Sequence, residues 1–434
     1  MEFSGSSNRK LFRKLRCEVK NYDWGLLGSE STVARLHSMN SDASIVEDKP
    51  YAELWMGTHD SGPSVLIGVE DEEKIGAFND GNENLKLWLA KNPNVLGDKV
   101  SQRWGNDLPF LFKVLSVAKA LSIQAHPDKE LAGMLHKEHP NLYKDANHKP
   151  EMALALTEFE ALCGFVGMEE LKEVLQSVPE IVEVVGSAAH EQTVLDISDE
   201  EDSEKVKAAL RLVFTQLMSA NTAVISQAVF NMMSRLNLES KERQLTEKEN
   251  LVLELERQYP ADVGVIAAFL FNHVKLKPGE ALYLGANEPH AYLSGECIEC
   301  MATSDNVVRA GLTPKLRDVQ TLCSMLTYKQ GFPDILEGVE VDPYTRKYLP
   351  PFEEFEVDRC ILPEGVSYNL RAVQGPSILL ITKGEGKSFE DDDVVSEGDV
   401  LFVPADTEIG ITVGNTSQLH LYRAGVNSSF FGAY

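Results

Sequence analysis

Gly279-Glu-Ala-Leu-Tyr-Leu-Gly-Ala-Asn-Glu-Pro-His290 decides the fold, because its pattern returns later as Gly398-Asp-Val-Leu-Phe-Val-Pro-Ala-Asp-Thr-Glu-Ile409. Each copy has an acidic turn, an apolar strand of four residues, a second turn and the start of another strand. Such a repeat is typical of two similar β-barrels or sandwiches in one chain. His290 in the first copy corresponds to Ile409 in the second, so a metal at this position is expected only in the first barrel.

The segments before and between the two copies alternate between strand and helix patterns. Residues 108–128 are predicted to form two strands around a turn. Between Met168 and Tyr259 apolar residues recur at helical spacing, and Thr246 is predicted to cap a helix; the clearest stripe is Val206, Leu210, Val213 and Leu217. The acidic stretch 196–207 is predicted to be a solvated loop that opens a helix.

Strand signals return from Val263, so the predicted fold is mainly β with a helical insertion. We expect two β domains and one α-helical domain. The predicted division is a discontinuous catalytic domain (1–167 and 263–330), a helical domain (168–262) and a C-terminal β domain without metal (331–434).

Charge excludes some classes of partner. The 434 residues include 41 Lys and Arg against 67 Asp and Glu, a net charge of −26. A nucleic-acid partner needs a basic face, so none is expected, whereas a small phosphorylated ligand needs only a local cationic pocket. No apolar run approaches the roughly 18 residues that span a bilayer, so no membrane partner is expected either.

Cysteine usage points to a reducing compartment. The six cysteines are scattered over a long chain, and the basic N-terminal stretch lacks the apolar core of a secretory signal. These features predict reduced thiols and a cytoplasmic location.

The segment Ser122-Ile-Gln124-Ala-His126 is the first candidate for chemistry. Residues two apart in a strand point to the same face, so these three polar side chains would lie together. On this fragment alone, a strand-end histidine with a structural role is the better interpretation.

Two further residues change that balance. Glu151 follows Pro150, which favours extended backbone before it, and His290 opens the strand after Pro289. Two imidazoles and a carboxylate are a usual ligand set for zinc or another catalytic divalent metal. An amide oxygen from Gln124 would complete a set of charge −1 against +2, which leaves the metal a Lewis acid.

Two other segments carry open alternatives. Cys297-Ile-Glu-Cys300 is a weak zinc signal, because there is no second pair and residues three apart in a strand face opposite ways. Glu299 between them is the more interesting residue. Ser304 to Lys315 is either an ordinary loop or a rim that presents Arg309 and Lys315 to an anionic group.

Five motifs together resemble type I mannose-6-phosphate isomerase (phosphomannose isomerase). They are Asn21-Tyr-Asp-Trp-Gly25, Ala52-Glu-Leu-Trp-Met-Gly-Thr-His59, Leu121-Ser-Ile-Gln-Ala-His-Pro-Asp-Lys129, Asn147-His-Lys-Pro-Glu151 and Asp305-Asn-Val-Val-Arg-Ala-Gly-Leu-Thr-Pro-Lys315. The resemblance implies cupin-like (jelly-roll) β domains, a helical insertion, one Zn²⁺ and interconversion of mannose 6-phosphate with fructose 6-phosphate. That reaction supplies mannose phosphates for GDP-mannose and glycan synthesis, and we expect a cytoplasmic monomer.

The resemblance also implies residue roles. The implied zinc ligands are Gln124, His126, Glu151 and His290. Arg309 matches the active-site arginine, and the residues around the sugar phosphate are Ser122, Lys149, Glu299 and Lys315. Glu299 is the first choice for the base that shuttles the proton, with Lys149 the competing assignment.

Two rival functions use similar residues. A metal-dependent cupin dioxygenase would also use two histidines and a carboxylate, with iron in place of zinc. A non-catalytic bicupin would bind metal or sugar without turnover. The cations Arg309 and Lys315 beside the expected metal favour a phosphorylated substrate over both.

Overall fold

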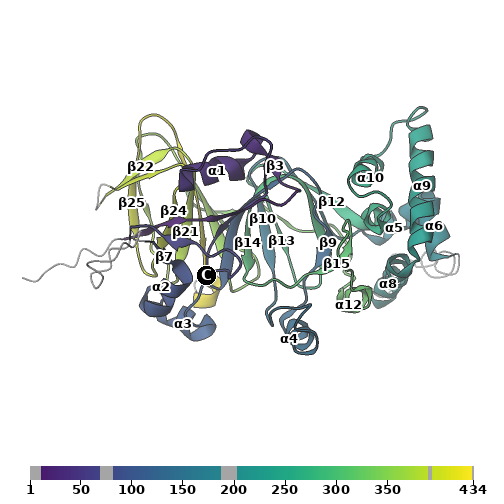
Figure 1. Cartoon of the computed structure of the whole chain (residues 1–434), viewed down its shortest axis with the longest axis horizontal. Helices are drawn as coiled ribbons and strands as arrows, with labels where there is room; N and C mark the ends of the chain where they lie inside the picture. The colour runs from purple at the N-terminus through teal and green to yellow at the C-terminus, as the bar shows by residue number, and fades with distance from the viewer. Residues whose placement is uncertain (1–10, 69–81, 187–202, 390–392, 433–434) are drawn as a thin grey trace, which may run out of the picture.

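The computed structural model describes residues 11–68, 82–186, 203–389 and 393–432. Strands form the middle and one end of the molecule, and a block of helices lies at the other end (Figure 1). The central strands follow the order β16-β13-β10-β14-β8-β5-β2, and β9, β11, β12 and β15 join them beside β14. Their bounds are β2 Glu18–Lys20, β5 Glu53–Met56, β8 Phe110–Val117, β9 Ile123–Ala125, β10 Glu151–Ala155, β11 Phe159–Phe165, β12 Phe271–Leu276, β13 Ala281–Leu284, β14 His290–Ala302, β15 Val308–Gly311 and β16 Ile335–Leu336.

Strand β14 connects two sets of strands. Its first residues pair with β9 and β11, and its later residues pair with β8 and β10. The strands β8 and β9 confirm the predicted strand-turn-strand at 108–128. Because β14 spans both sets, residues at its start and in its middle can face one interior space.

The C-terminal strands form a second β unit. Its larger sheet has the order β17-β18-β19-β26-β21-β24-β1-β6-β7, and its smaller sheet has the order β20-β25-β22-β23. The N-terminal strands β1, β6 and β7 therefore extend a sheet made mostly of C-terminal strands. The bounds are β1 Arg13–Arg16, β6 Val65–Leu66, β7 Glu83–Asn84, β17 Val339–Asp342, β18 Thr345–Tyr348, β19 Glu356–Leu362, β20 Ser367–Leu370, β21 Ser377–Lys383, β22 Glu385–Ser388, β23 Val394–Ser396, β24 Val400–Val403, β25 Ile409–Val413 and β26 Leu419–Gly425.

The predicted internal repeat is confirmed in the backbone. Gly279 and Gly398, which precede β13 and β24, have φ of +92° and +89°. The next turns also match, since Asn287 and Asp406 have φ of +62° and +57°. β14 begins at His290 and β25 begins at Ile409. Ile409 is part of an apolar core.

The helices at the end of the molecule share one apolar core with β9, β11 and β15. Their bounds are α5 Met168–Ser177, α6 Pro179–Val185, α8 Ser203–Ser219, α9 Thr222–Glu239, α10 Glu247–Gln258, α11 Val263–Ala267 and η3 Ala268–Leu270. The predicted stripe lies on α8, where Leu210, Val213 and Leu217 are buried. Of the acidic stretch 196–207, the part up to 202 lies outside the described residues.

The prediction that strands resume at Val263 was wrong. Val263–Ala267 form the short helix α11, and β12 begins only at Phe271. The run from Val263 to Phe271 is buried throughout, and a continuous apolar run of this length has no periodicity that separates strand from helix. The side chain of Asp262 caps the helix by accepting a hydrogen bond from Gly264 N at 2.6 Å.

Shorter elements complete the described chain. They are η1 Gly28–Glu30, α1 Thr32–Ser41, α2 Leu85–Lys91, η2 Pro93–Leu96, α3 Asp98–Trp104, α4 Lys129–Glu138, α12 Val319–Met325, η4 Ser428–Phe431 and the paired strands β3 Leu26–Leu27 and β4 Pro50–Tyr51. Within the described residues, no helix taken singly has the length and apolar character to cross a membrane. One pair of consecutive helices has that length and apolar character only when the two are taken together: Glu204–Ser219 and Thr222–Glu239. The chain bends by 103° between them.

Replacing Thr246 by Ala is expected to loosen α10. Thr246 Oγ1 accepts a hydrogen bond from Glu249 N at 3.2 Å, and Glu249 Oε2 accepts one from Thr246 N at 2.7 Å. Loss of such a cap costs about 1 kcal/mol. Hydrogen exchange of the α10 amides should accelerate about fivefold. Ser234→Ala, which removes an exposed hydroxyl bound to the Phe230 carbonyl, is the control, and unchanged exchange in Thr246→Ala would contradict the prediction.

Candidate metal centre and adjoining cavity

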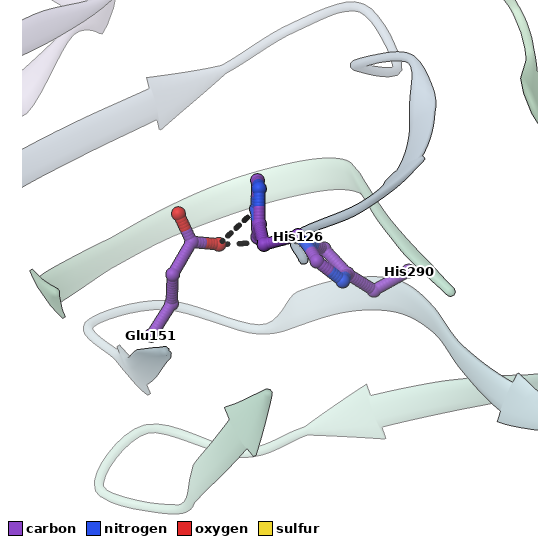
Figure 2. Close-up of side chains that lie close together, drawn as sticks. All are labelled: His126, Glu151 and His290. Atoms are coloured by element: carbon purple, nitrogen blue, oxygen red, sulfur yellow. Dashed lines mark ion pairs between the residues drawn. The ribbon is translucent and has the colours of Figure 1, made fainter. Parts of the chain in front are cut away.

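Three side chains from separate segments converge among the central strands around β14, which form the first β unit (Figure 2). His126 directly follows β9, Glu151 begins β10 and His290 begins β14. One ligand atom from each lies within 4.8 Å of the others, and the residues are 0%, 1% and 2% exposed. Among the described residues, no second group of three or more His, Cys, Asp or Glu side chains converges in this way.

Hydrogen bonds on the far side of each imidazole orient its free nitrogen. His126 Nδ1 lies 2.7 Å from the Asn306 carbonyl oxygen, and His290 Nδ1 lies 3.0 Å from the Glu288 carbonyl oxygen. A carbonyl only accepts, so each Nδ1 carries the hydrogen in the neutral ring. Each Nε2 then presents a lone pair, and this pattern of outer hydrogen bonds is typical of metal-binding histidines.

The two free nitrogens face one carboxylate oxygen. Glu151 Oε2 is 3.4 Å from His126 Nε2 and 3.3 Å from His290 Nε2. None of these three buried atoms has a hydrogen-bond partner. Burial, together with the nearby Lys149 ammonium, lowers the pKa of His126 to about 4, so this imidazole is neutral near pH 7. Three buried acceptors without a donor between them fit a divalent cation.

Lys149 keeps the carboxylate charged. Its Nζ lies 2.7 Å from Glu151 Oε1, whereas the histidines face the other carboxylate oxygen, Oε2. Burial alone would raise the pKa of Glu151, but the nearby Lys149 ammonium outweighs it and holds that pKa well below its usual range. The lysine therefore leaves Oε2 available as an anionic ligand.

Gln124 lies beside this centre. It pairs across the strands with His290 on one side and Arg309 on the other. Its Oε1 accepts a hydrogen bond from Ser122 Oγ at 3.3 Å, as the shared strand face predicted. Its place as a fourth ligand stays a prediction.

A cavity of about 490 Å³ opens onto the centre. Seven of the nine candidate residues line it, namely Ser122, Gln124, Lys149, Glu151, Glu299, Arg309 and Lys315. His126 and His290 are not among its lining residues and are almost fully buried. The cavity thus brings the expected substrate-binding residues together above the metal-binding group.

A row of paired residues builds one wall of the cavity. Trp55 on β5 pairs with Lys113 on β8, and Lys113 pairs with Glu299 on β14. Directly paired residues of neighbouring strands point to the same face, so these three side chains stand together. Cys297 and Cys300 belong to different apolar cores, which agrees with the prediction that they face opposite ways along the strand.

Two buried charged residues of this wall were missed from the sequence. Lys113 Nζ lies 2.9 Å from Glu299 Oε2 and 3.4 Å from Glu53 Oε2, and Glu53 also accepts a hydrogen bond from Trp55 Nε1. A lysine within the apolar strand Phe110–Val117 was the signal that could have drawn attention to it.

Glu299 is a stronger base than an exposed glutamate. Burial raises its pKa, and the nearby Glu151 adds to the rise, although Lys113 opposes both. Lys113 stays charged, because the attraction of Glu299 and Glu53 outweighs the cost of burial. The wall therefore holds a buried carboxylate whose proton affinity is increased.

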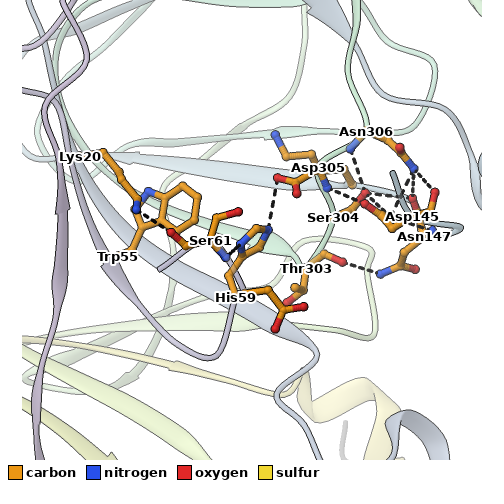
Figure 3. Close-up of polar contacts among 12 residues, drawn as sticks. Lys20, Trp55, His59, Ser61, Asp145, Asn147, Thr303, Ser304, Asp305 and Asn306 are labelled. Atoms are coloured by element: carbon orange, nitrogen blue, oxygen red, sulfur yellow. Dashed lines mark hydrogen bonds and ion pairs between the residues drawn. The ribbon is translucent and has the colours of Figure 1, made fainter. Parts of the chain in front are cut away.

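A polar network beside Trp55 supports another part of the cavity lining, which includes His59, Ser304 and Asp305 (Figure 3). The Asp145 carboxylate accepts hydrogen bonds from Ser304 Oγ and Asp305 N, both at 2.8 Å. Asn306 Nδ2 donates to the Asp145 carbonyl at 2.7 Å, which fixes the residue whose own carbonyl orients His126. The same loop places Asp305 Oδ1 3.3 Å from His59 Nε2.

Comparison with known proteins assigns the family. Residues 11–168 match the family model of the catalytic domain of type I phosphomannose isomerase, and residues 184–271 match its helical insertion domain. The chain belongs to the type I phosphomannose isomerase family. Mannose-6-phosphate isomerase 1 of Arabidopsis thaliana is 59% identical over 98% of this chain and 96% of that protein. Mannose-6-phosphate isomerase of Homo sapiens is 41% identical over 94% of this chain and 97% of that protein.

Solved structures of the family share the fold. A mannose 6-phosphate isomerase bound with zinc and yttrium has a TM-score of 0.79 and 28% identity, and the match covers 96% of this chain and all (100%) of that one. The enzyme from Salmonella typhimurium bound to its substrate fructose 6-phosphate and to zinc has a TM-score of 0.77 at the same coverage and identity. This likeness confirms the expected cupin-type fold with a helical insertion.

Proposed function

We propose that this chain is a zinc-dependent aldose–ketose isomerase that interconverts mannose 6-phosphate and fructose 6-phosphate by proton transfer through an enediol. The observation that carries the proposal is the group of three unpartnered ligand atoms of His126, Glu151 and His290 beneath a cavity lined by Glu299 and Arg309. Membership of the type I phosphomannose isomerase family agrees with it.

Four residues would hold the zinc ion: Gln124, His126, Glu151 and His290. Their total charge is −1, so bound Zn²⁺ would supply a Lewis acid that polarises the O1/O2 edge of the open-chain sugar. Lys149 supports the site by keeping Glu151 ionised.

Glu299 is proposed as the base that moves the proton between C1 and C2. A C–H next to a carbonyl is a weak acid, so the base needs increased proton affinity and a position inside the cavity. Glu299 has both, and its contact with Lys113 fixes its direction. The Nζ of Lys149, the competing candidate, forms an ion pair with Glu151 Oε1 at 2.7 Å, and a charged ammonium has no lone pair to offer.

The cations of the cavity suit an anionic sugar. Arg309 is proposed to stabilise the negative charge of the enediolate, and Lys315 with Ser122 is proposed to hold the phosphate. Among the described residues, neither Arg309 nor Lys315 has a carboxylate within ion-pair distance. Phosphate bound at a distance from the reacting carbons orients the sugar for proton transfer.

The two rival functions find no support among the relatives. The curated relatives at 59% and 41% identity are mannose-6-phosphate isomerases, and a structural relative at 28% identity contains the substrate fructose 6-phosphate with zinc. A cupin dioxygenase or a non-catalytic bicupin is therefore not favoured.

The remaining assignments extend the proposal. We place the enzyme in the cytoplasm as a monomer that supplies mannose phosphates for GDP-mannose and glycan synthesis. All six cysteines are buried and free, as expected in a reducing compartment, and the net charge of −26 disfavours self-association. We keep the proposed domains 1–167 with 263–330, 168–262 and 331–434, except that β1, β6 and β7 of the first part pair within the C-terminal sheet.

The function is tested by metal analysis of the purified protein combined with a coupled assay for fructose 6-phosphate formed from mannose 6-phosphate. We expect one zinc per chain, loss of activity on treatment with a chelator and recovery when zinc is restored. Full activity in a protein shown to be free of divalent metal would refute the proposal.

Replacing Lys315 by Ala is expected to raise the KM for mannose 6-phosphate. A hydrogen bond to a charged group contributes about 1.5–3 kcal/mol, which corresponds to about a 10- to 100-fold change. Steady-state kinetics should show a much smaller change in kcat. Lys137→Ala, at an exposed lysine of α4 outside the cavity, is the control. An unchanged KM in Lys315→Ala would remove this residue from the phosphate site.

A further inference from the structure

The helical insertion contacts the cavity at its own C-terminal end. Gln258 Oε1 accepts a hydrogen bond from Ala120 N at 2.8 Å, and Tyr259 OH donates one to the Ala120 carbonyl at 2.5 Å. Ala120 lies two residues before Ser122, and Tyr259 itself lines the cavity. Thus the insertion holds one of the two segments proposed to bind the phosphate.

Asp262 holds the other segment. Its Oδ1 accepts hydrogen bonds from Gly264 N at 2.6 Å and from Leu312 N at 2.7 Å, and its Oδ2 accepts one from Thr313 N at 3.2 Å. A single carboxylate therefore joins the start of α11 to the loop after β15. Thr313 Oγ1 in turn accepts a hydrogen bond from Lys315 N at 3.1 Å.

The geometry of the loop depends on this junction. Leu312 has φ of +52°, which a leucine adopts only where the surroundings impose it. Gly264 and Gly311 touch, since a Cβ on Gly311 would lie 2.6 Å from Gly264 Cα. The three hydrogen bonds to Asp262 hold both sides of this contact, because one comes from Gly264 and the others from Leu312 and Thr313. Lys315, two residues after Thr313, is exposed.

We propose that Asp262 is a positioning residue that ties the helical insertion to the Leu312–Lys315 loop and thereby sets the affinity for the substrate's phosphate. This inference rests on the proposed phosphate role of Lys315. It gives the insertion a function in substrate binding, because the carboxylate that orders the loop belongs to the chain segment at the end of the insertion.

The test compares Asp262→Asn with the wild-type enzyme, both saturated with zinc. Asparagine has nearly the same shape as aspartate, but its amide NH₂ replaces one carboxylate oxygen. A donor would then face a backbone N–H group where an acceptor now lies. We expect the KM for mannose 6-phosphate and the inhibition constant of inorganic phosphate to rise about tenfold. We expect kcat to change less than about threefold and the zinc content to stay the same, because no metal ligand touches Asp262.

Asn221→Ala is the matched control. Asn221 caps α9 in the same insertion by accepting a hydrogen bond from Ala223 N at 2.8 Å, the same local contact that Asp262 makes with Gly264 N. It lies outside the cavity lining. An equal rise in KM in Asn221→Ala would overturn the inference, because general loosening of the insertion would then explain the effect.

A double-mutant cycle with Lys315→Ala tests whether Asp262 affects phosphate binding through Lys315. If Asp262 acts through Lys315, Asp262→Asn should change KM less than about twofold in the Lys315→Ala background. Independent effects of the two substitutions would overturn the inference. Should Asp262→Asn not fold, Thr313→Val removes the acceptor for Lys315 N and is expected to give the same KM rise, and an unchanged KM there would overturn it.

The outcomes separate this inference from the proposed function. An active wild type whose KM is unchanged in Asp262→Asn but raised in Lys315→Ala would overturn the inference alone. A wild type without isomerase activity would overturn the proposed function.

Discussion

Replacing Glu151 or His290 by Ala is expected to abolish zinc binding and isomerase activity together, with kcat reduced by about 10³-fold or more. Each substitution removes one of three unpartnered atoms that face the same point. Glu151→Ala should be the more severe, because it also leaves Lys149 Nζ unpaired in a buried site, and a free ammonium repels an incoming cation. Metal content per chain and the coupled assay measure the two losses.

The control for this pair is His273→Ala. His273 Nε2 lies 2.8 Å from Glu160 Oε2, so it is another His–Glu pair of the same β unit, outside the cavity. We expect this variant to keep its zinc and most of its activity. A variant of Glu151 or His290 that is free of metal yet fully active would disprove the proposed centre.

Replacing Glu299 by Gln is expected to lower kcat by about 10²- to 10⁴-fold while zinc remains bound, because the amide cannot accept the proton. Exchange of the C2 hydrogen of the sugar with deuterium from solvent should be lost in parallel. Lys149→Met is the discriminating partner. If Lys149 were the base, exchange would survive in Glu299→Gln and be lost in Lys149→Met.

Glu296→Gln controls for the loss of a buried carboxylate on the same strand. Glu296 is 8% exposed, accepts hydrogen bonds from Thr32 and Ser116, and does not line the cavity. Its variant should retain deuterium exchange. Wild-type exchange in Glu299→Gln would show that the proton shuttle is another group.

Much of the metal centre was predictable from local sequence. Pro150 and Pro289 precede Glu151 and His290, and both residues open strands as expected. The repeat around His290 was also readable, because glycine and asparagine are the residues that permit the positive φ of its two turns.

The charged wall of the cavity was not predictable in this way. Lys113, Glu53 and Glu299 meet only because β5, β8 and β14 pair in one register, and those strands are far apart in the sequence. A shift of one residue would turn these side chains to the opposite face. The sequence around Asp262 also does not show that its carboxylate accepts hydrogen bonds from the Leu312–Lys315 loop, because Lys315 lies 53 residues later in the chain.

By itself the sequence determined which residues could bind a metal, where the strands of the repeat begin and which block is helical, since these depend on side-chain chemistry and on local backbone preference. Only the tertiary structure decided that β1, β6 and β7 join the C-terminal sheet and that the histidine nitrogens are oriented by the carbonyls of Asn306 and Glu288. The reason is that strand pairing and hydrogen bonds between distant segments depend on how the whole chain packs.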